Sequence, residues 1–192
     1  MAARAGGAAV EFVLILPVLI VLTFGIIDFA RFINARVAVA NISRETGNLI
    51  SRDANFEGRT VSQATNLQNY LAGVWKINSA SEDWKVYGSL IEAGTATNAP
   101  ASVNPGGVPG APFINYGQLD YQCSIARPKF GLSDRMFNHL VYNGTNGAAD
   151  ISQIHIAEVY YKYRPITPLP NFIENILLKD GGGIIVGSKA YF

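Results

Sequence analysis

The chain has 192 residues, which is enough for one modest domain and one further element. It carries 15 basic and 14 acidic side chains, and the formal net charge of +1 gives no reason to expect nucleic acid or another polyanion as a partner. The single cysteine, Cys123, excludes an internal disulfide bond. Because Cys123 falls in an alternating apolar pattern, we expect a buried and unreactive thiol.

An apolar run lies close to the N-terminus. Residues 12–27 contain no charged side chain and are bounded by Glu11 and Asp28. At a rise of about 1.5 Å per residue this run spans roughly 24 Å, and its apolar neighbours bring it to the thickness of a bilayer. A cleaved secretory signal fits less well, because its small residues follow its apolar region, whereas AGGAA at 5–9 comes first here. The sequence predicts a membrane-spanning helix that stays on the mature chain.

This helix is predicted to continue as an amphipathic stalk to about residue 50. Apolar residues recur at steps of three and four, which places them on one stripe with polar residues between them. The stripe consists of Ile26, Phe29, Ile33, Val37 and Ala40. Pro17 removes a backbone hydrogen bond and predicts a bend. Asp28 is expected at the membrane edge, where its carboxylate reaches water.

Two motifs give this segment a resemblance to a known family. GGAAVEF at 6–12 is followed by the apolar run with its internal proline and then by FGIIDFARF at 24–32. The arrangement resembles the type IVb prepilin-like segment of the TadE/TadF minor pilins of tight-adherence (Flp) pili, with the TadE-like branch favoured. VANISRETGNLISR at 39–52 and EVYYKYRPITPLP at 158–170 resemble later parts of that family.

The resemblance implies a subunit that is processed before assembly. A prepilin peptidase would remove the leader, residues 1–6, by cutting between Gly6 and Gly7, which makes Glu11 the fifth residue of the mature chain and Phe12 the aromatic residue after it. The Glu11 carboxylate would then meet a freed amino group inside a bundle of helices. Such a pair offsets the burial cost of each charge and sets the register between neighbours. The alternative is a carboxylate that merely sits among lipid head groups.

Residues 51–192 are predicted to form an exported α+β domain, so that residues 7–50 form the transmembrane and assembly helix. A small antiparallel sheet would pack on the amphipathic half of this helix, with one or two extra helices, as in pilins. The first expected element is a helix from Thr60 to Trp75 that buries Val61, Ala64, Leu67, Leu71, Val74 and Trp75. Strands are expected at 84–90, at 119–125 and at 151–164, the last with an irregularity at 157–158, and an edge strand at 181–192. A loop at 94–117, a turn at 143–147 and a short helix after Pro170 complete the domain.

The sequence shows no recognisable catalytic or metal-binding constellation. His139 and His155 lie in different elements, and neither has a second ligand at the spacing of a zinc site. We therefore predict neither enzyme activity, nor a metal, nor a cofactor. An aromatic concentration near the C-terminus is either a covered sheet face or a surface for a partner subunit. It consists of Tyr160, Tyr161, Tyr163, Tyr191 and Phe192.

The leading hypothesis is a minor pilin or pseudopilin that takes part in the assembly or initiation of a tight-adherence pilus. The implied partners are the inner membrane, other major and minor pilin subunits, the prepilin peptidase and the pilus assembly platform. The N-terminus would be cytoplasmic and the globular domain exported, in the inner membrane or in the extracellular pilus. The alternative is a membrane-anchored periplasmic binding module in which the helix is a plain tether and the loop at 94–117 binds a ligand. A tether should tolerate replacement of Glu11.

Overall fold

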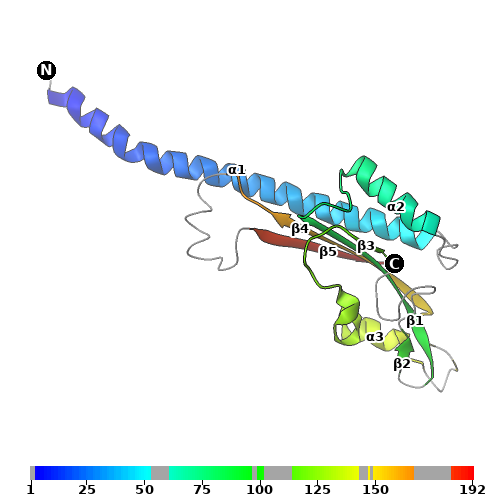
Figure 1. Cartoon of the computed structure of the whole chain (residues 1–192). Coiled ribbons are helices and arrows are strands. Elements are labelled where there is room, and N and C mark those ends of the chain that lie inside the picture. Colours follow the sequence, from blue (N-terminus) through cyan, green and yellow to red (C-terminus); the bar gives the residue numbers. More distant parts are fainter. Residues whose placement is uncertain are drawn as a thin grey trace. The chain divides into compact units, whose positions relative to one another are not determined.

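The structure of the chain is a computed structural model in which residues 3–52, 61–96, 99–101, 114–142, 147, 149–166 and 183–192 are described. It divides into two compact units, Met1–Val37 with Tyr163–Ile184 and Ala38–Lys162 with Ile185–Phe192. Helix α1, Ala3–Arg52, contributes its first part to one unit and its last part to the other (Figure 1). The first unit therefore contains the apolar run, and the second contains the sheet.

Helix α1 is continuous through Pro17, which confirms the single long helix predicted from the sequence. A helix suits this run because the backbone groups between its ends are hydrogen-bonded within the helix, as an apolar environment requires. The side-chain hydroxyl of Thr23, which lies inside the run, donates a hydrogen bond to the carbonyl of Leu19 at 2.7 Å. The bend predicted at Pro17 remains a prediction.

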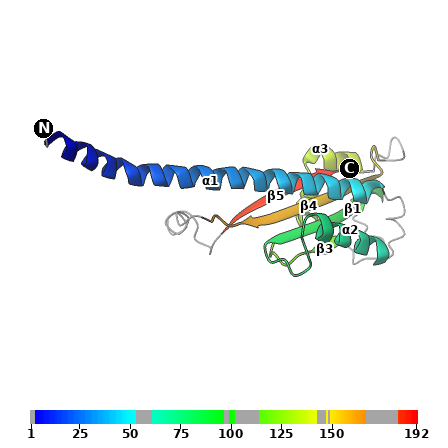
Figure 2. The ribbon, with the colours of Figure 1, turned by 90° about the horizontal axis from the view of Figure 1, so that it is seen from above.

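The second unit is built on a five-stranded sheet with the order β2-β1-β4-β5, in which β3 also pairs with β1. The strands are β1 (Trp84–Ala96), β2 (Ala99–Ala101), β3 (Ile114–Tyr116), β4 (Gln153–Tyr163) and β5 (Ile184–Tyr191). Strand β1 is antiparallel to β2, β3 and β4. His155 and Phe192 exchange both backbone hydrogen bonds, at 2.8 and 3.0 Å, which is the antiparallel pattern for β4 and β5. Figure 2 shows β1, β4 and β5 side by side.

One face of the sheet packs against the last turns of α1. The register pairs Val86 with Val159 and Gly88 with Ala157 on this face. Gly88 allows the close approach of α1, because a Cβ atom there would meet Ile50 Cδ1 at 3.0 Å. The buried apolar residues of the helical layer are Val39, Ile42 and Ile50 of α1 and Leu67 and Leu71 of α2 (Val61–Val74).

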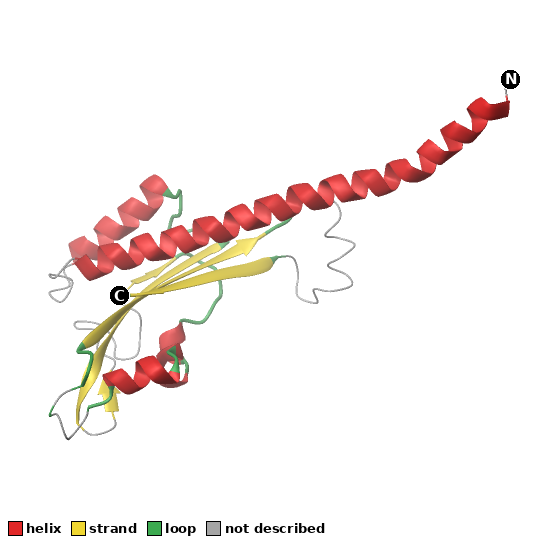
Figure 3. Ribbon diagram, turned by 180° about the vertical axis from the view of Figure 1, so that it is seen from behind, coloured by secondary structure: helices red, strands yellow, loops and turns green. Residues whose placement is uncertain are grey.

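The opposite face is covered by α3 (Asp134–Leu140) and by the segment that precedes it, as Figures 1 and 3 show. Two apolar clusters fill this layer, one around Ile91, Leu140 and Ile156 and the other around Tyr87, Leu119, Cys123, Ile125 and Tyr160. Ser133 caps α3, since its hydroxyl accepts a hydrogen bond from the backbone N–H of Met136 at 3.4 Å. The sequence did not predict α3.

The prediction that the apolar stripe of α1 packs on the sheet is wrong. Ile33 is 43% exposed and Val37 is 54% exposed, whereas the buried positions include Ser43, Thr46 and Gly47. Small and polar residues form much of the contact because they let the sheet approach closely. A Cβ atom at Gly47 would clash with the ring of Phe192. Hydropathy did not reveal this face, since Ser43, Thr46 and Gly47 lie on it between the apolar residues Val39, Ile42 and Ile50.

Two strand predictions and one loop prediction also need correction. Residues 119–125 are not a strand; their apolar side chains lie on the sheet, and Ser124–Ala126 forms a 3-10 turn. The register between β1 and β4 is unbroken at 157–158, so the predicted irregularity is absent there. The alternation of apolar and polar residues is lost in β4 because both of its faces are covered. Within the predicted loop at 94–117, β1 continues to Ala96, and β2 and β3 form.

The remaining predictions divide by outcome. Helix α2 and the strands β1, β4 and β5 are confirmed, and β5 lies at the edge of the sheet. Leu67 and Leu71 are buried as predicted, but Val74 is 57% exposed. The Thr60 cap, the side chains of Val61 and Ala64, most of the turn at 143–147 and the helix after Pro170 lie outside the described residues.

The C-terminus of α2 gives a test of backbone strain. Lys76 has φ 57°, which is the left-handed conformation, just after the end of α2, and the N–H of the next residue, Ile77, donates to the carbonyl of Leu71 at 3.1 Å. Since glycine adopts this conformation without a Cβ penalty, Lys76→Gly should raise the free energy of unfolding by about 1 kcal/mol. Lys76→Ala serves as the control and should give no such gain. Urea unfolding of the purified chain in detergent measures both, and equal effects of the two substitutions would contradict the assignment.

Candidate functional site

The apolar part of α1 is exposed along its described length. None of its most apolar stretch is buried, and the mean hydropathy of that stretch is 2.7. Side chains on every side of the helix are open, for example Phe12 at 63%, Leu14 at 70% and Val18 at 66% exposed. The helix is long and apolar enough to cross a membrane. An apolar surface of this size is unfavourable in water and needs lipid or other helices around it.

Glu11 is exposed and adjoins Phe12 at the beginning of this apolar surface. Within the described part of the chain, its carboxylate has no hydrogen-bond or ion-pair partner. In an apolar environment an ionised carboxylate without a partner is costly. The structure thus leaves Glu11 free to pair with a group from outside the described residues.

The predicted cleavage site lies near the N-terminal end of α1. Gly6 and Gly7 are both in the helix, and a Cβ atom at Gly7 would meet nothing within 4 Å. Packing therefore does not require a glycine at this position. Each glycine in a helix costs about 1 kcal/mol relative to alanine, so this pair makes local unwinding easier than elsewhere in α1. Unwound backbone is what a peptidase needs to reach the bond, and cleavage here remains a prediction.

Asp28 ends the apolar run and makes contacts that the sequence did not reveal. Within the first unit, the backbone N–H of Ile166 donates to Asp28 Oδ1 at 3.3 Å, and the hydroxyl of Tyr163 donates to the Asp28 carbonyl at 3.1 Å. The ring of Tyr163 also meets Phe32 edge-on, with centroids 5.6 Å apart. Asp28 was expected only to contact water, but it also binds the end of β4 and the residues after it to the helix.

The largest polar feature that the sequence analysis missed is a buried carboxylate on β4. Glu158 is 1% exposed, and its Oε2 accepts hydrogen bonds from the backbone N–H of Ser124 at 3.1 Å and from the hydroxyl of Tyr160 at 2.9 Å. Its Oε1 lies 3.7 Å from Nζ of Lys189. Burial is the main cause that raises the pKa of Tyr160, and the nearby Glu158 adds to it. No local pattern could have revealed this network, because Ser124 and Lys189 come from distant segments.

The groups with potential reactivity are placed for structural roles. Cys123 is buried as predicted, and burial raises the pKa of its thiol, so the nucleophilic thiolate is disfavoured. His139 Nδ1 lies 2.8 Å from Asp150 Oδ2 and joins α3 to the chain before β4. The described residues contain no group of three or more metal ligands.

The predicted aromatic concentration does not form one surface. Tyr160 and Tyr163 are buried, and Tyr161 stacks on Trp84 with ring centroids 4.3 Å apart. Tyr191 and Phe192, in contrast, are 38% and 41% exposed. The covered-face interpretation therefore holds for β4. Tyr191 and Phe192 at the end of β5 are exposed, and a partner subunit for them stays a prediction.

The Glu158 network predicts a large effect of a single substitution. Glu158→Ala removes the acceptor that ties Ser124 to the sheet and leaves Lys189 without its partner, so unfolding should become easier by about 3 kcal/mol. Glu158→Gln keeps an acceptor oxygen and should cost less. Both are measured by urea unfolding of the full chain. Glu82→Gln changes an exposed residue and serves as the control. If Glu158→Ala lowered the free energy of unfolding no more than Glu82→Gln does, the network would have no structural role.

Comparison with known proteins bears on the N-terminal segment. Residues 6–47 match the family model described as TadE-like protein. Neither the curated proteins nor the solved structures gave a match. The matched segment contains the exposed apolar helix, Glu11, Pro17 and Asp28. The N-terminal segment, residues 6–47, is thus similar to the TadE-like protein family.

Proposed function

We propose that the chain is a minor pilin or pseudopilin of a tight-adherence pilus. A prepilin peptidase removes residues 1–6 between Gly6 and Gly7, residues 7–50 cross the inner membrane and dock to other pilins, and residues 51–192 form the exported domain. The N-terminus is cytoplasmic, and the protein acts in the initiation or assembly of the filament with the assembly platform. Its work is docking and not catalysis.

The observation that carries this proposal is Glu11 on an apolar helix that the described residues of the chain leave exposed. A tether needs only to be apolar, and a carboxylate makes insertion less favourable. A subunit that packs against other helices gains from the same carboxylate if the partner supplies a cation. After cleavage the α-amino group of Gly7 lies four residues before Glu11, one helical turn away. That amino group, from the same or a neighbouring subunit, is the proposed partner.

The stripe on α1 supports helix-to-helix docking. Ile26, Phe29, Ile33 and Val37 are 60%, 65%, 43% and 54% exposed, so an amphipathic surface remains available beyond the apolar run. Side chains at this spacing are suited to the packing of one helix against another. We assign this stripe to contacts with neighbouring pilin helices.

Replacement of Glu11 tests the proposal. Removing one partner of a buried charge pair costs about 3–5 kcal/mol, so each helix contact should weaken by more than about a hundredfold with Glu11→Gln. Piliation should therefore be lost while the protein still reaches the membrane in normal amount. Glu11→Asp keeps the charge and should retain part of the activity.

The measurements are pilus counts by electron microscopy and immunoblots of the membrane fraction. Glu82→Gln, a carboxylate exposed in the second unit, is the matched control and should leave piliation unchanged. Normal piliation with both Glu11→Gln and Glu11→Leu would contradict the proposal and favour a plain membrane tether.

A further inference from the structure

Strand β5 presents an open edge of the sheet. It is the last strand in the order β2-β1-β4-β5, so its outer side has no neighbouring strand among the described residues. Phe192 exchanges backbone hydrogen bonds with His155. The antiparallel pattern alternates, so the N–H and C=O groups of Lys189 and Tyr191 point away from β4. These groups are available to pair with a further strand.

The usual protection of an edge strand is weak in β5. Native edges are commonly guarded by proline, by bulges or by outward-pointing lysines. The sequence of β5, IIVGSKAY, has no proline, and its one charged residue is Lys189. Continuing the register from His155 and Phe192 places Lys189 opposite Glu158, and its Nζ lies 3.7 Å from Glu158 Oε1. The contact with Glu158 thus turns the Lys189 side chain toward the sheet, and the outer edge of β5 has no outward-pointing charge that would prevent strand pairing.

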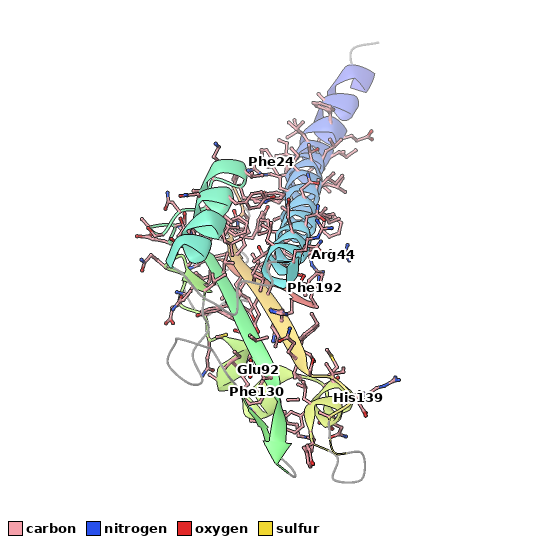
Figure 4. All side chains as sticks on the ribbon, turned by 90° about the vertical axis from the view of Figure 1, so that its right-hand side faces the viewer. Phe24, Arg44, Glu92, Phe130, His139 and Phe192 are labelled. Carbon is pink, nitrogen blue, oxygen red and sulfur yellow. The ribbon has the colours of Figure 1, made fainter. Side chains whose placement is uncertain are left out.

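A pocket lies beside this edge, within the second unit. It has a volume of about 420 Å³ and is lined by Ala40, Arg44 and Asn48 of α1 and by residues 188–192. Figure 4 shows Arg44 and Phe192 next to each other at this place. Arg44 is exposed, and no acidic side chain of the described residues forms an ion pair with it. The pocket therefore joins the guanidinium of Arg44, which has no acidic partner among the described residues, to the end of β5 and the partly exposed ring of Phe192.

We propose that β5 and this pocket bind an extended, acidic segment of another protein. The segment adds to the sheet as a strand through the outward backbone groups of β5, and one of its carboxylates pairs with Arg44. Its apolar side chains cover Tyr191 and Phe192. Strand addition of this kind takes affinity from backbone hydrogen bonds and specificity from side-chain pockets. Charge complementarity excludes a second copy of β5 as the occupant, because neither β5 nor Phe192 carries an acidic side chain.

The test uses a synthetic peptide about as long as β5, which has 8 residues, with alternating Thr and Val and a central Asp. A second peptide has Lys in place of Asp. Binding to the full chain in detergent is followed by fluorescence anisotropy. The Asp peptide should bind about threefold more tightly than the Lys peptide, because an exposed ion pair with Arg44 contributes a fraction of a kcal/mol to binding. Arg44→Glu should reverse this preference. Arg135→Glu, an exposed change on α3, should leave it unchanged.

A second substitution separates strand addition from simple charge attraction. Tyr191→Pro removes an outward N–H and leaves the bonds between Phe192 and His155 in place, so the chain should stay folded, as checked by circular dichroism. It should reduce binding of both peptides by at least about tenfold. The proposal is overturned by absent binding of the Asp peptide at about 1 mM, by equal affinity for the two peptides, or by unchanged binding to Tyr191→Pro. It is also overturned if β5 pairs with itself, seen as a dimer in analytical ultracentrifugation that Tyr191→Pro abolishes.

Discussion

The apolar first part of α1 is not covered by the described residues of its own chain, and the rest of the account depends on this exposure. None of its most apolar stretch is buried. Full burial of one Val, Leu, Ile or Phe side chain is worth about 1.5–3 kcal/mol, so the free energy available from lipid or from neighbouring helices is large. The helix satisfies its own backbone, but Glu11 has no partner among the described residues and would be penalised in an apolar environment. On the proposed function, neighbouring helices supply both an apolar surface and a partner for this carboxylate.

From Ala38 onward the same helix is covered by its own chain. Small residues make this possible: Gly47 admits the ring of Phe192, and the hydroxyls of Ser43 and Ser188 lie 2.8 Å apart across the contact between α1 and β5. The opposite face of the sheet depends on a buried charge, since Glu158 ties the segment at Ser124 to β4 and turns Lys189 inward. The second unit thus closes its core on both faces and leaves its open surface at the edge of β5.

The sequence predicted the elements whose signal is local. The uncharged run of α1 and the alternation in β1 were sufficient to recognise them, and the α+β class followed. The buried face of α1 was missed because it depends on what packs against it, and there Ser43, Thr46 and Gly47 are small enough for β5 and the sheet. The alternation of Leu119, Cys123 and Ile125 correctly indicated burial but not a strand, because the segment packs on the face of the sheet and Ser124–Ala126 forms a 3-10 turn. The Glu158 network could not be predicted, because two of its members, Ser124 and Lys189, are far from Glu158 in sequence.

The central claim is that Glu11 meets an amino group that exists only after the chain is cut near Gly6. The most direct measurement is the N-terminus of the natural protein, determined by intact mass and N-terminal peptide mapping on material from sheared filaments and from membranes. The account predicts that residues 1–6 are absent and that the chain begins at Gly7, or one residue later because two glycines adjoin. A functional protein that retains residues 1–6, or one cut after Ala30, would contradict it, because no free amino group would then lie one turn before Glu11.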